Sequence, residues 1–145
     1  MKVLSIDPSG TGTTGICLIS NEQIEFQEYQ DKDWQKHYHF IVSLVKAFKP
    51  SVLLFENTNF LSNRSKDSLN LIRLLGALEC LGIKQVDSVN VLKVKDLSKK
   101  LLAGIFQIEN LQYLPGRGKG WMFNNKRISI HCLEAYLVYW LFLNK

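Results

Sequence analysis

The beginning of the chain consists of short apolar runs separated by polar turns. The run from Val3 to Ile6 stops at Asp7, a turn with Pro8 and several glycines follows, and a second apolar run extends from Ile16 to Ile19. A third strand is expected from Ile24 to Tyr29, where successive residues alternate between two faces. The pattern therefore predicts three antiparallel strands at the start of the fold.

The period then changes from that of a strand to that of a helix. Asp31 or Asp33 can cap a helix whose apolar residues stand at positions 34, 38, 41, 45 and 48, and Pro50 marks its end. The next run, Ser51 to Phe55, is apolar throughout, as in strands buried on both faces, and it ends in Glu56. Because a helix separates this strand from the earlier ones, we expect it to be parallel to one of them.

The second half of the chain predicts helices that alternate with one more strand. We expect a helix from near Ser65 to Gly82, a strand from Gln85 to Val89, a helix from Val94 to about Phe106, a loop rich in glycine and basic residues from Leu114 to Asn125, and a closing helix from about Ser129. Together these elements predict an α/β fold with a mixed five-stranded sheet, three antiparallel strands and then parallel strands, flanked by helices.

Length and composition are those of one folded domain. The chain has 145 residues, of which 46% are hydrophobic and 21% are charged. A chain of this size buries a sufficient core without disulfides or a structural metal, and its composition argues against disorder. We therefore expect a single domain over residues 1–145.

The cysteines and the apolar C-terminal run bear on the compartment. Cys17, Cys80 and Cys132 are odd in number, far apart and set among apolar residues, which predicts buried, reduced thiols. The run from Ile128 to Leu143 is shorter than the roughly 20 residues of a membrane span, so it is interpreted as a core helix. The N-terminus lacks the pattern of a signal peptide. These features predict a cytoplasmic protein without a membrane partner.

Candidate chemistry lies where two of the predicted strands end. Asp7 follows the first strand and Glu56 follows the fourth. If the strands are parallel neighbours, the two carboxylates lie at one edge of the sheet, where a proton or a cation relieves their repulsion. Oxygen ligands of this kind favour Mg²⁺ or Mn²⁺. Taken singly, Asp7 is more simply a turn residue and Glu56 a loop cap, and only their joint placement favours a metal site.

His131 and Glu134 add two polar residues to the apolar C-terminal helix. They are three positions apart and therefore share a helix face. In isolation, a buried core histidine and a glutamate that extends to the surface would be the preferred explanation. Asp7 and Glu56 call for further ligands, so we interpret the pair as part of the same site.

Basic residues form two groups that suit contacts with phosphate. The formal net charge is +5. One group comprises Lys93, Lys95, Lys99 and Lys100, and the other comprises Arg117, Lys119, Lys126 and Arg127. No acidic residue lies between Asn110 and Leu133. Such groups predict a nucleic-acid partner, although a solvated basic face is the more frequent meaning of short lysine runs.

Four segments, in chain order, resemble the RuvC-type Holliday-junction resolvases of the ribonuclease-H-like superfamily. They are VLSIDPSGTGTTGI from Val3 to Ile16, PSVLLFENTNF from Pro50 to Phe60, the helical stretch from Asn63 to Gly82, and HCLEA from His131 to Ala135. The resemblance covers nearly the whole chain. Two departures are that the turn has the order DPSG where the family usually has DPGS, and that Glu134 stands where most members have aspartate.

The resemblance implies a function as well as a ribonuclease-H-like fold. It implies an endonuclease that resolves four-way DNA junctions by paired symmetric nicking with two divalent ions, and a homodimer formed partly by the helix after Glu56. The family's catalytic and metal-ligating positions fall on Asp7, Glu56, His131 and Glu134. Phe60 lies one residue further from Glu56 than the aromatic that many members place near unpaired bases, so a core position explains it as well as a DNA contact.

Other functions are compatible with some of the same residues. A YqgF-type nuclease, or a related enzyme that cuts flaps or other branched DNA, would use the same carboxylates. A catalytically silent DNA-binding module would need only the basic residues. Asp7 followed by a Gly/Thr-rich turn also opens sugar-kinase and actin-like ATP-binding domains, but those need a second similar domain, for which 145 residues leave no room.

Overall fold

A five-stranded sheet forms the centre of the computed structural model, which describes residues 1–57, 66–118 and 120–145. The strand order is β3-β2-β1-β4-β5. The strands are β1 (Lys2–Asp7), β2 (Thr13–Ser20), β3 (Gln23–Gln30), β4 (Val52–Asn57) and β5 (Gln85–Asn90). The helices are α1 (Trp34–Phe48), α2 (Lys66–Glu79), α3 (Val91–Leu102) and α4 (Ile130–Leu143). The predicted mixed sheet with flanking helices is confirmed.

The central strand, β1, gives the sheet its mixed character. It pairs antiparallel with β2 and parallel with β4, while β2 and β3 are antiparallel and β4 and β5 are parallel. The register of β1 and β4 places Ile6 opposite Phe55. The next residues along the two strands, Asp7 and Glu56, therefore lie side by side at one edge of the sheet, where β1 ends at Asp7 and β4 ends one residue after Glu56.

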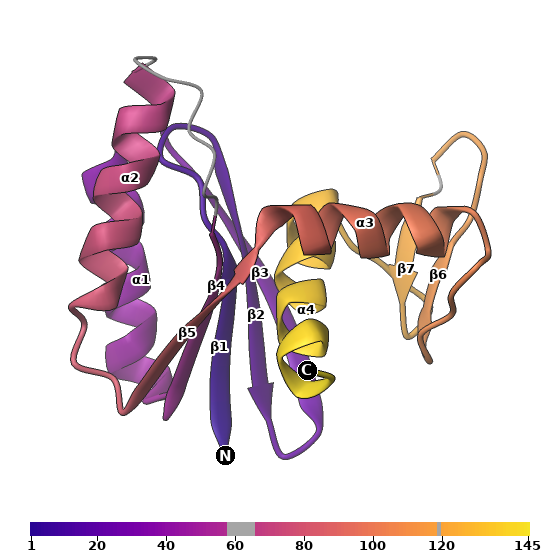
Figure 1. Cartoon of the computed structure of the whole chain (residues 1–145), viewed down its shortest axis with the longest axis horizontal. Helices are drawn as coiled ribbons and strands as arrows, with labels where there is room; N and C mark the ends of the chain where they lie inside the picture. The colour runs from indigo at the N-terminus through magenta and orange to yellow at the C-terminus, as the bar shows by residue number, and fades with distance from the viewer. Residues whose placement is uncertain (58–65, 119) are drawn as a thin grey trace.

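Helices cover both faces of the sheet (Figure 1), with α1 and α2 on one face and α4 on the other. Alternation along the strands divides the core accordingly. Leu4 and Phe55 pack in the cluster that lies beneath α1 and α2, whereas Val3 and Leu54 pack in the cluster that includes Leu133 of α4. Side chains at odd positions of β1 and even positions of β4 thus face α4.

Polar caps set where three of the helices begin. The side chains of Asp33, Asn90 and Ser129 accept backbone N–H groups at the starts of α1, α3 and α4, at 2.9, 2.8 and 3.1 Å respectively. The cap at Asn90 starts α3 earlier than the predicted Val94. Gly104, with φ of 71°, ends that helix before the predicted Phe106.

The segment between α3 and α4 differs from the prediction. The expected loop from Leu114 to Asn125 contains a strand, and a small antiparallel sheet forms from β6 (Leu111–Tyr113), β7 (Trp121–Phe123) and β8 (Lys126–Arg127). Phe123 explains the difference, because its ring lies 5.3 Å from that of Phe26 and 5.0 Å from that of Tyr136. This apolar packing outweighs the loop tendency of the neighbouring glycines.

Two smaller predictions also need correction. Cys80 is exposed, while Cys17 and Cys132 are buried as expected. Cys80 follows directly after α2, which buries Leu74 and Leu78 and so leaves position 80 on the solvent side. The helix itself ends at Glu79, before the predicted Gly82. Among the described residues, no helix has the length and apolarity that a membrane crossing requires.

Candidate metal centre

Strand alternation brings Asp7 and Glu56 to the α4 side of the sheet. Ser5, two residues before Asp7, donates a hydrogen bond from Oγ to the carbonyl oxygen of Ala135 on α4, at 2.7 Å. Leu54, two residues before Glu56, packs in the core cluster that contains α4. Residues two apart on a strand share a face, so both carboxylates face the first turns of this helix.

Helix α4 contributes a third carboxylate through a close approach to β2. A Cβ atom at Gly15 would overlap the carbonyl group of His131, so this position leaves room only for a hydrogen. The approach brings Glu134, which is only 5% exposed, into the space next to β1 and β4. Oxygens of Asp7, Glu56 and Glu134 all lie within 4.8 Å of one another.

The environment of these carboxylates fits a bound cation. The Oε2 atom of Glu56 is the one buried side-chain nitrogen or oxygen without a hydrogen-bond partner within the described part of the chain. Leaving such an atom unsatisfied is costly, and a cation would satisfy it. Three oxygen ligands without a sulfur ligand suit Mg²⁺ or Mn²⁺.

Mutual repulsion and burial perturb the acids. Burial, with contributions from Asp7 and Glu134, raises the pKa of Glu56 from 4.5 to about 8. Burial also raises the pKa of Asp7 from 3.8 to about 6, against the lowering effect of the nearby imidazole of His131. The cluster therefore retains protons near neutral pH unless a cation replaces them.

His131 borders the cluster and contacts one of its members. Its Nδ1 lies 3.6 Å from Oδ2 of Asp7, and its side chain is 40% exposed. The contact with Asp7 raises the pKa of His131. His131 is therefore not a fully buried core histidine. Its role as a metal ligand or proton carrier stays a prediction.

Lys95 contacts the acidic cluster itself, whereas its sequence context predicts only a phosphate contact. Its Nζ forms an ion pair with Oε1 of Glu134, which links α3 to α4. Asp7 and Glu56 also act on it electrostatically, and together the acids raise the pKa of Lys95 against the effect of its burial. The position of Lys95 in the chain could have indicated this contact. Lys95 lies in the second turn of α3, and α3 begins where β5, the neighbour of β4, ends.

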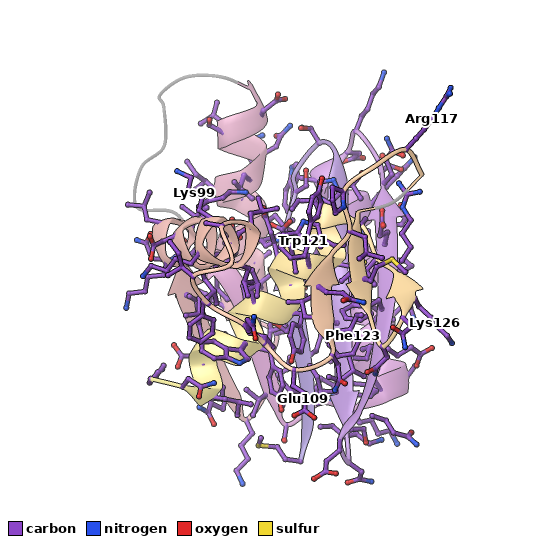
Figure 2. The ribbon with its side chains drawn as sticks, turned by 90° about the vertical axis from the view of Figure 1, so that its right-hand side faces the viewer. Lys99, Glu109, Arg117, Trp121, Phe123 and Lys126 are labelled. Carbon is purple, nitrogen blue, oxygen red and sulfur yellow. The ribbon has the colours of Figure 1, made fainter. Side chains whose placement is uncertain are left out.

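The other predicted DNA contacts lie outside the acidic cluster. Lys93, Lys99 and Lys100 are exposed on α3, and Lys100 pairs with Asp96 at 2.9 Å. Figure 2 shows Arg117 and Lys126 extending from the small sheet, on the other side of the view from Lys99. Arg127 donates a hydrogen bond to the carbonyl oxygen of Gly118 at 3.3 Å. Phe60 and Lys119 lie outside the described residues.

Comparisons with known proteins give matches among solved structures, while no family model and no curated protein matches the chain. The structure of Thermus thermophilus RuvC in complex with a Holliday junction substrate matches with a TM-score of 0.63 at 14% identity, over 100% of this chain and 97% of that chain. Another structure of Thermus thermophilus RuvC gives 0.55 at 15% identity, over 95% and 90%.

A eukaryotic structure gives a similar result. Ydc2, the yeast mitochondrial Holliday junction resolvase, matches with a TM-score of 0.50 at 14% identity, over 94% of this chain and 75% of that chain. The chain therefore has the RuvC-like, ribonuclease-H-like fold that its sequence predicts.

Proposed function

We propose that this protein is a metal-dependent endonuclease that resolves four-way DNA junctions by paired symmetric nicking. The observation that carries the proposal is the convergence of Asp7, Glu56 and Glu134, from β1, β4 and α4, on one site. The RuvC-like fold supports it, because junction-resolving proteins share the arrangement of strands and helices that brings the three acids together.

The residues of the site have distinct proposed roles. Asp7, Glu56 and Glu134 would hold two divalent ions, Mg²⁺ or Mn²⁺, which when bound would activate water and stabilise the leaving oxygen of a phosphodiester. His131, partly exposed beside Asp7, ligates an ion or moves a proton at its imidazole. Lys95 provides a positive charge that is already in the site and can contact the phosphate beside the cleaved bond.

Two groups of cations, one on α3 and one on the small sheet, suit a long, polyanionic substrate. On α3 they are Lys93, Lys99 and Lys100, and on the small sheet and its turns they are Arg117, Lys126 and Arg127. Lys126 and His131 are five residues apart, and an extended chain spans at most ~3.6 Å per residue. Lys126, which begins β8, is therefore within reach of a DNA strand that passes His131.

A homodimer matches the two-fold symmetry of a junction, since two sites can then cut two strands. Helix α2 offers a surface for it. Leu69 and Ile72 are 47% and 42% exposed on this helix, whereas Leu74 and Leu78 are buried in the core. The exposed apolar side chains are available to a second copy of the chain. Sedimentation of a monomer at concentrations that give efficient paired cleavage would contradict this part of the proposal.

The decisive experiment combines a substrate series with matched variants. Four-way junctions, flaps, forks and linear duplexes are incubated with the protein in Mg²⁺, and cleavage and binding are measured separately. Asp7→Asn, Glu56→Gln and Glu134→Gln should each abolish cleavage but retain junction binding, because they remove ligand charges without removing phosphate contacts. The control is Glu109→Gln, which changes an exposed acid that does not belong to the cluster and lies low in the view of Figure 2.

The outcomes separate the related functions. Preferential cleavage of flaps would indicate a different branched substrate for the same chemistry. Binding without cleavage in Mg²⁺ or Mn²⁺ by the unmodified protein would indicate a DNA-binding module. Full activity in one carboxylate variant would remove that residue from the site.

A further inference from the structure

His37 on α1 is the centre of a buried hydrogen-bond network. Its side chain is 0% exposed. Its Nδ1 lies 2.8 Å from Oγ1 of Thr14 on β2, and its Nε2 lies 2.7 Å from the carbonyl oxygen of Asp31. The network lies on the face of the sheet that α1 and α2 cover, opposite α4 (Figure 1).

The chemistry of the partners fixes the direction of each hydrogen bond. A carbonyl oxygen only accepts, so Nε2 of His37 carries the hydrogen that it donates to Asp31. In the neutral imidazole Nδ1 then accepts the Thr14 hydroxyl hydrogen at 2.8 Å, a shorter contact than the 3.3 Å from this hydroxyl to the carbonyl oxygen of Ser9. The hydroxyl oxygen in turn accepts from the backbone N–H of Ser9 at 3.0 Å. One continuous chain of donors thus runs from Ser9 through Thr14 and His37 to Asp31.

This chain of hydrogen bonds holds the turn that directly follows Asp7. Asp31 returns to the same turn by donating its backbone N–H to the carbonyl oxygen of Gly12 at 3.1 Å. On the other side, a Cβ atom at Gly10 would lie 2.7 Å from backbone atoms of α2. The turn is therefore held between α2 and the His37 network.

We infer that His37 is a positioning residue that fixes Asp7 through Thr14 and Ser9. Ser9 is two residues after Asp7, and the intervening Pro8 has a restricted φ, so a displaced Ser9 would displace the carboxylate. The inference rests on the proposed function, in which Asp7 holds metal. Metal sites depend on outer partners that orient their ligands, and here that partner acts from the opposite face of the sheet.

A purely structural histidine is the alternative. Its cost would be high, because a polar ring without exposure needs a partner for each nitrogen, and an apolar residue would fill the space without that demand. Both nitrogens of His37 bond to elements outside α1, namely β2 and the segment that follows β3. Because His37 connects separate elements in this way, a role in positioning Asp7 is favoured over a role in filling the core.

The test measures metal binding in the absence of DNA. Thr14→Val keeps the shape of the side chain and removes the hydroxyl, while Thr14→Ser keeps the hydroxyl. We expect Thr14→Val to weaken Mn²⁺ affinity, measured by calorimetry, about fivefold, the effect of losing one hydrogen bond. Thr14→Ser should restore nearly the original affinity. In cleavage assays Thr14→Val should lower kcat and leave the KM for the junction unchanged.

Two further variants separate positioning from stability. Ile41→Val, on the same helix and also 0% exposed, should lower thermal stability without changing Mn²⁺ affinity. His37→Phe, which keeps a ring and removes both nitrogens, should weaken Mn²⁺ binding as Thr14→Val does, and it decides the matter if Thr14→Val does not fold. Unchanged Mn²⁺ affinity in the folded variant would overturn the inference. A failure of the unmodified protein to bind Mn²⁺ would instead overturn the proposed metal site.

Discussion

Gly15 on β2 lies directly against the carbonyl group of His131, so a strand backbone and the first turn of α4 meet without an intervening side chain. This contact determines how near Glu134 comes to Asp7 and Glu56. Since the contact is between backbone and backbone, it cannot adjust by a change of rotamer.

We therefore predict that Gly15→Ala displaces the start of α4. The added methyl group should destabilise the protein by about 3 kcal/mol or more, at the upper end of the usual cost of overpacking, and should abolish Mg²⁺-dependent cleavage. Thermal unfolding and calorimetric Mn²⁺ binding measure the two effects. The control is Gly76→Ala on α2, where the added carbon meets nothing within 4 Å and stability should not fall. Unchanged Mn²⁺ binding by Gly15→Ala would show that the approach is not needed for the site.

A second prediction concerns the stability of the metal-free protein as a function of pH. The pKa of Glu56 is raised to about 8 and that of Asp7 to about 6, so the folded state holds protons that the unfolded state has lost. The contribution of these two acids to stability should therefore be largest below the ordinary pKa values of 4.5 and 3.8 and should fall as pH rises toward about 8. His131, whose pKa is also raised, acts in the same direction.

Thermal unfolding at a series of pH values, with and without Mg²⁺, measures this dependence. Mg²⁺ should stabilise the protein increasingly as pH rises, because protons then compete less for the carboxylates. Glu56→Gln should flatten the metal-free profile. Asp31 and Asp87, whose pKa values are lowered, affect stability only in more acidic solution. A metal-free protein whose stability rises between pH 5 and 8 would contradict the shifts described for the acids.

A third prediction separates the two effects of Lys95. Its ammonium group neutralises part of the acidic cluster through Glu134. Lys95→Met should therefore tighten Mn²⁺ binding, which is best measured above pH 8, where proton competition is small. The same variant should slow cleavage, because the charge next to the phosphate is lost. Lys99→Met, one turn along α3 and exposed, is the control and should leave Mn²⁺ affinity unchanged. Weaker Mn²⁺ binding by Lys95→Met would indicate that the lysine organises the carboxylates.

The fourth prediction tests the turn between β6 and β7. Replacement of both Arg117 and Lys119 by alanine should weaken junction binding and reduce the salt slope by roughly 1 to 2 units of log K per log salt. Cleavage-site preference should not change, because phosphate contacts carry no base information. Lys32 and Lys46, exposed at the two ends of α1, provide a double alanine control with the same change in charge. Equal slopes for the two double variants would place this turn away from DNA.

Local patterns were sufficient to predict the sheet and two of its carboxylates. Asp7 and Glu56 each end an apolar run, and a single crossover helix implies that their strands are parallel. Glu134 was identified as polar within an apolar helix, three positions from His131. These signals are local in sequence, and the rules of strand alternation and helix periodicity convert them directly into positions in space.

Strand alternation and helix periodicity could not predict interactions between segments that are distant in the sequence. Lys95 and Glu134 are on different helices, and only the packing of α3 beside α4 brings them together. The strand β7 forms because Phe123 packs against Phe26 and Tyr136, which are remote in the chain. His37 had no visible partner in the sequence, since Thr14 and Asp31 join it only after α1 has packed on the sheet.

The small sheet formed by β6, β7 and β8 is separate from the five-stranded sheet, and none of Asp7, Glu56 and Glu134 belongs to it. On one side α3 is fixed by its cap at Asn90, and on the other α4 is fixed by Ser129 and by the hydrogen bond between Ser5 and Ala135. Trp121 and Phe123 of this sheet are buried in the same core as α4, so the part that can be lengthened, shortened or exchanged without moving the carboxylates is the turn between β6 and β7. Under the proposed function, exchanging this turn in an engineered chimera would change the contacts with DNA and leave the metal site as it is.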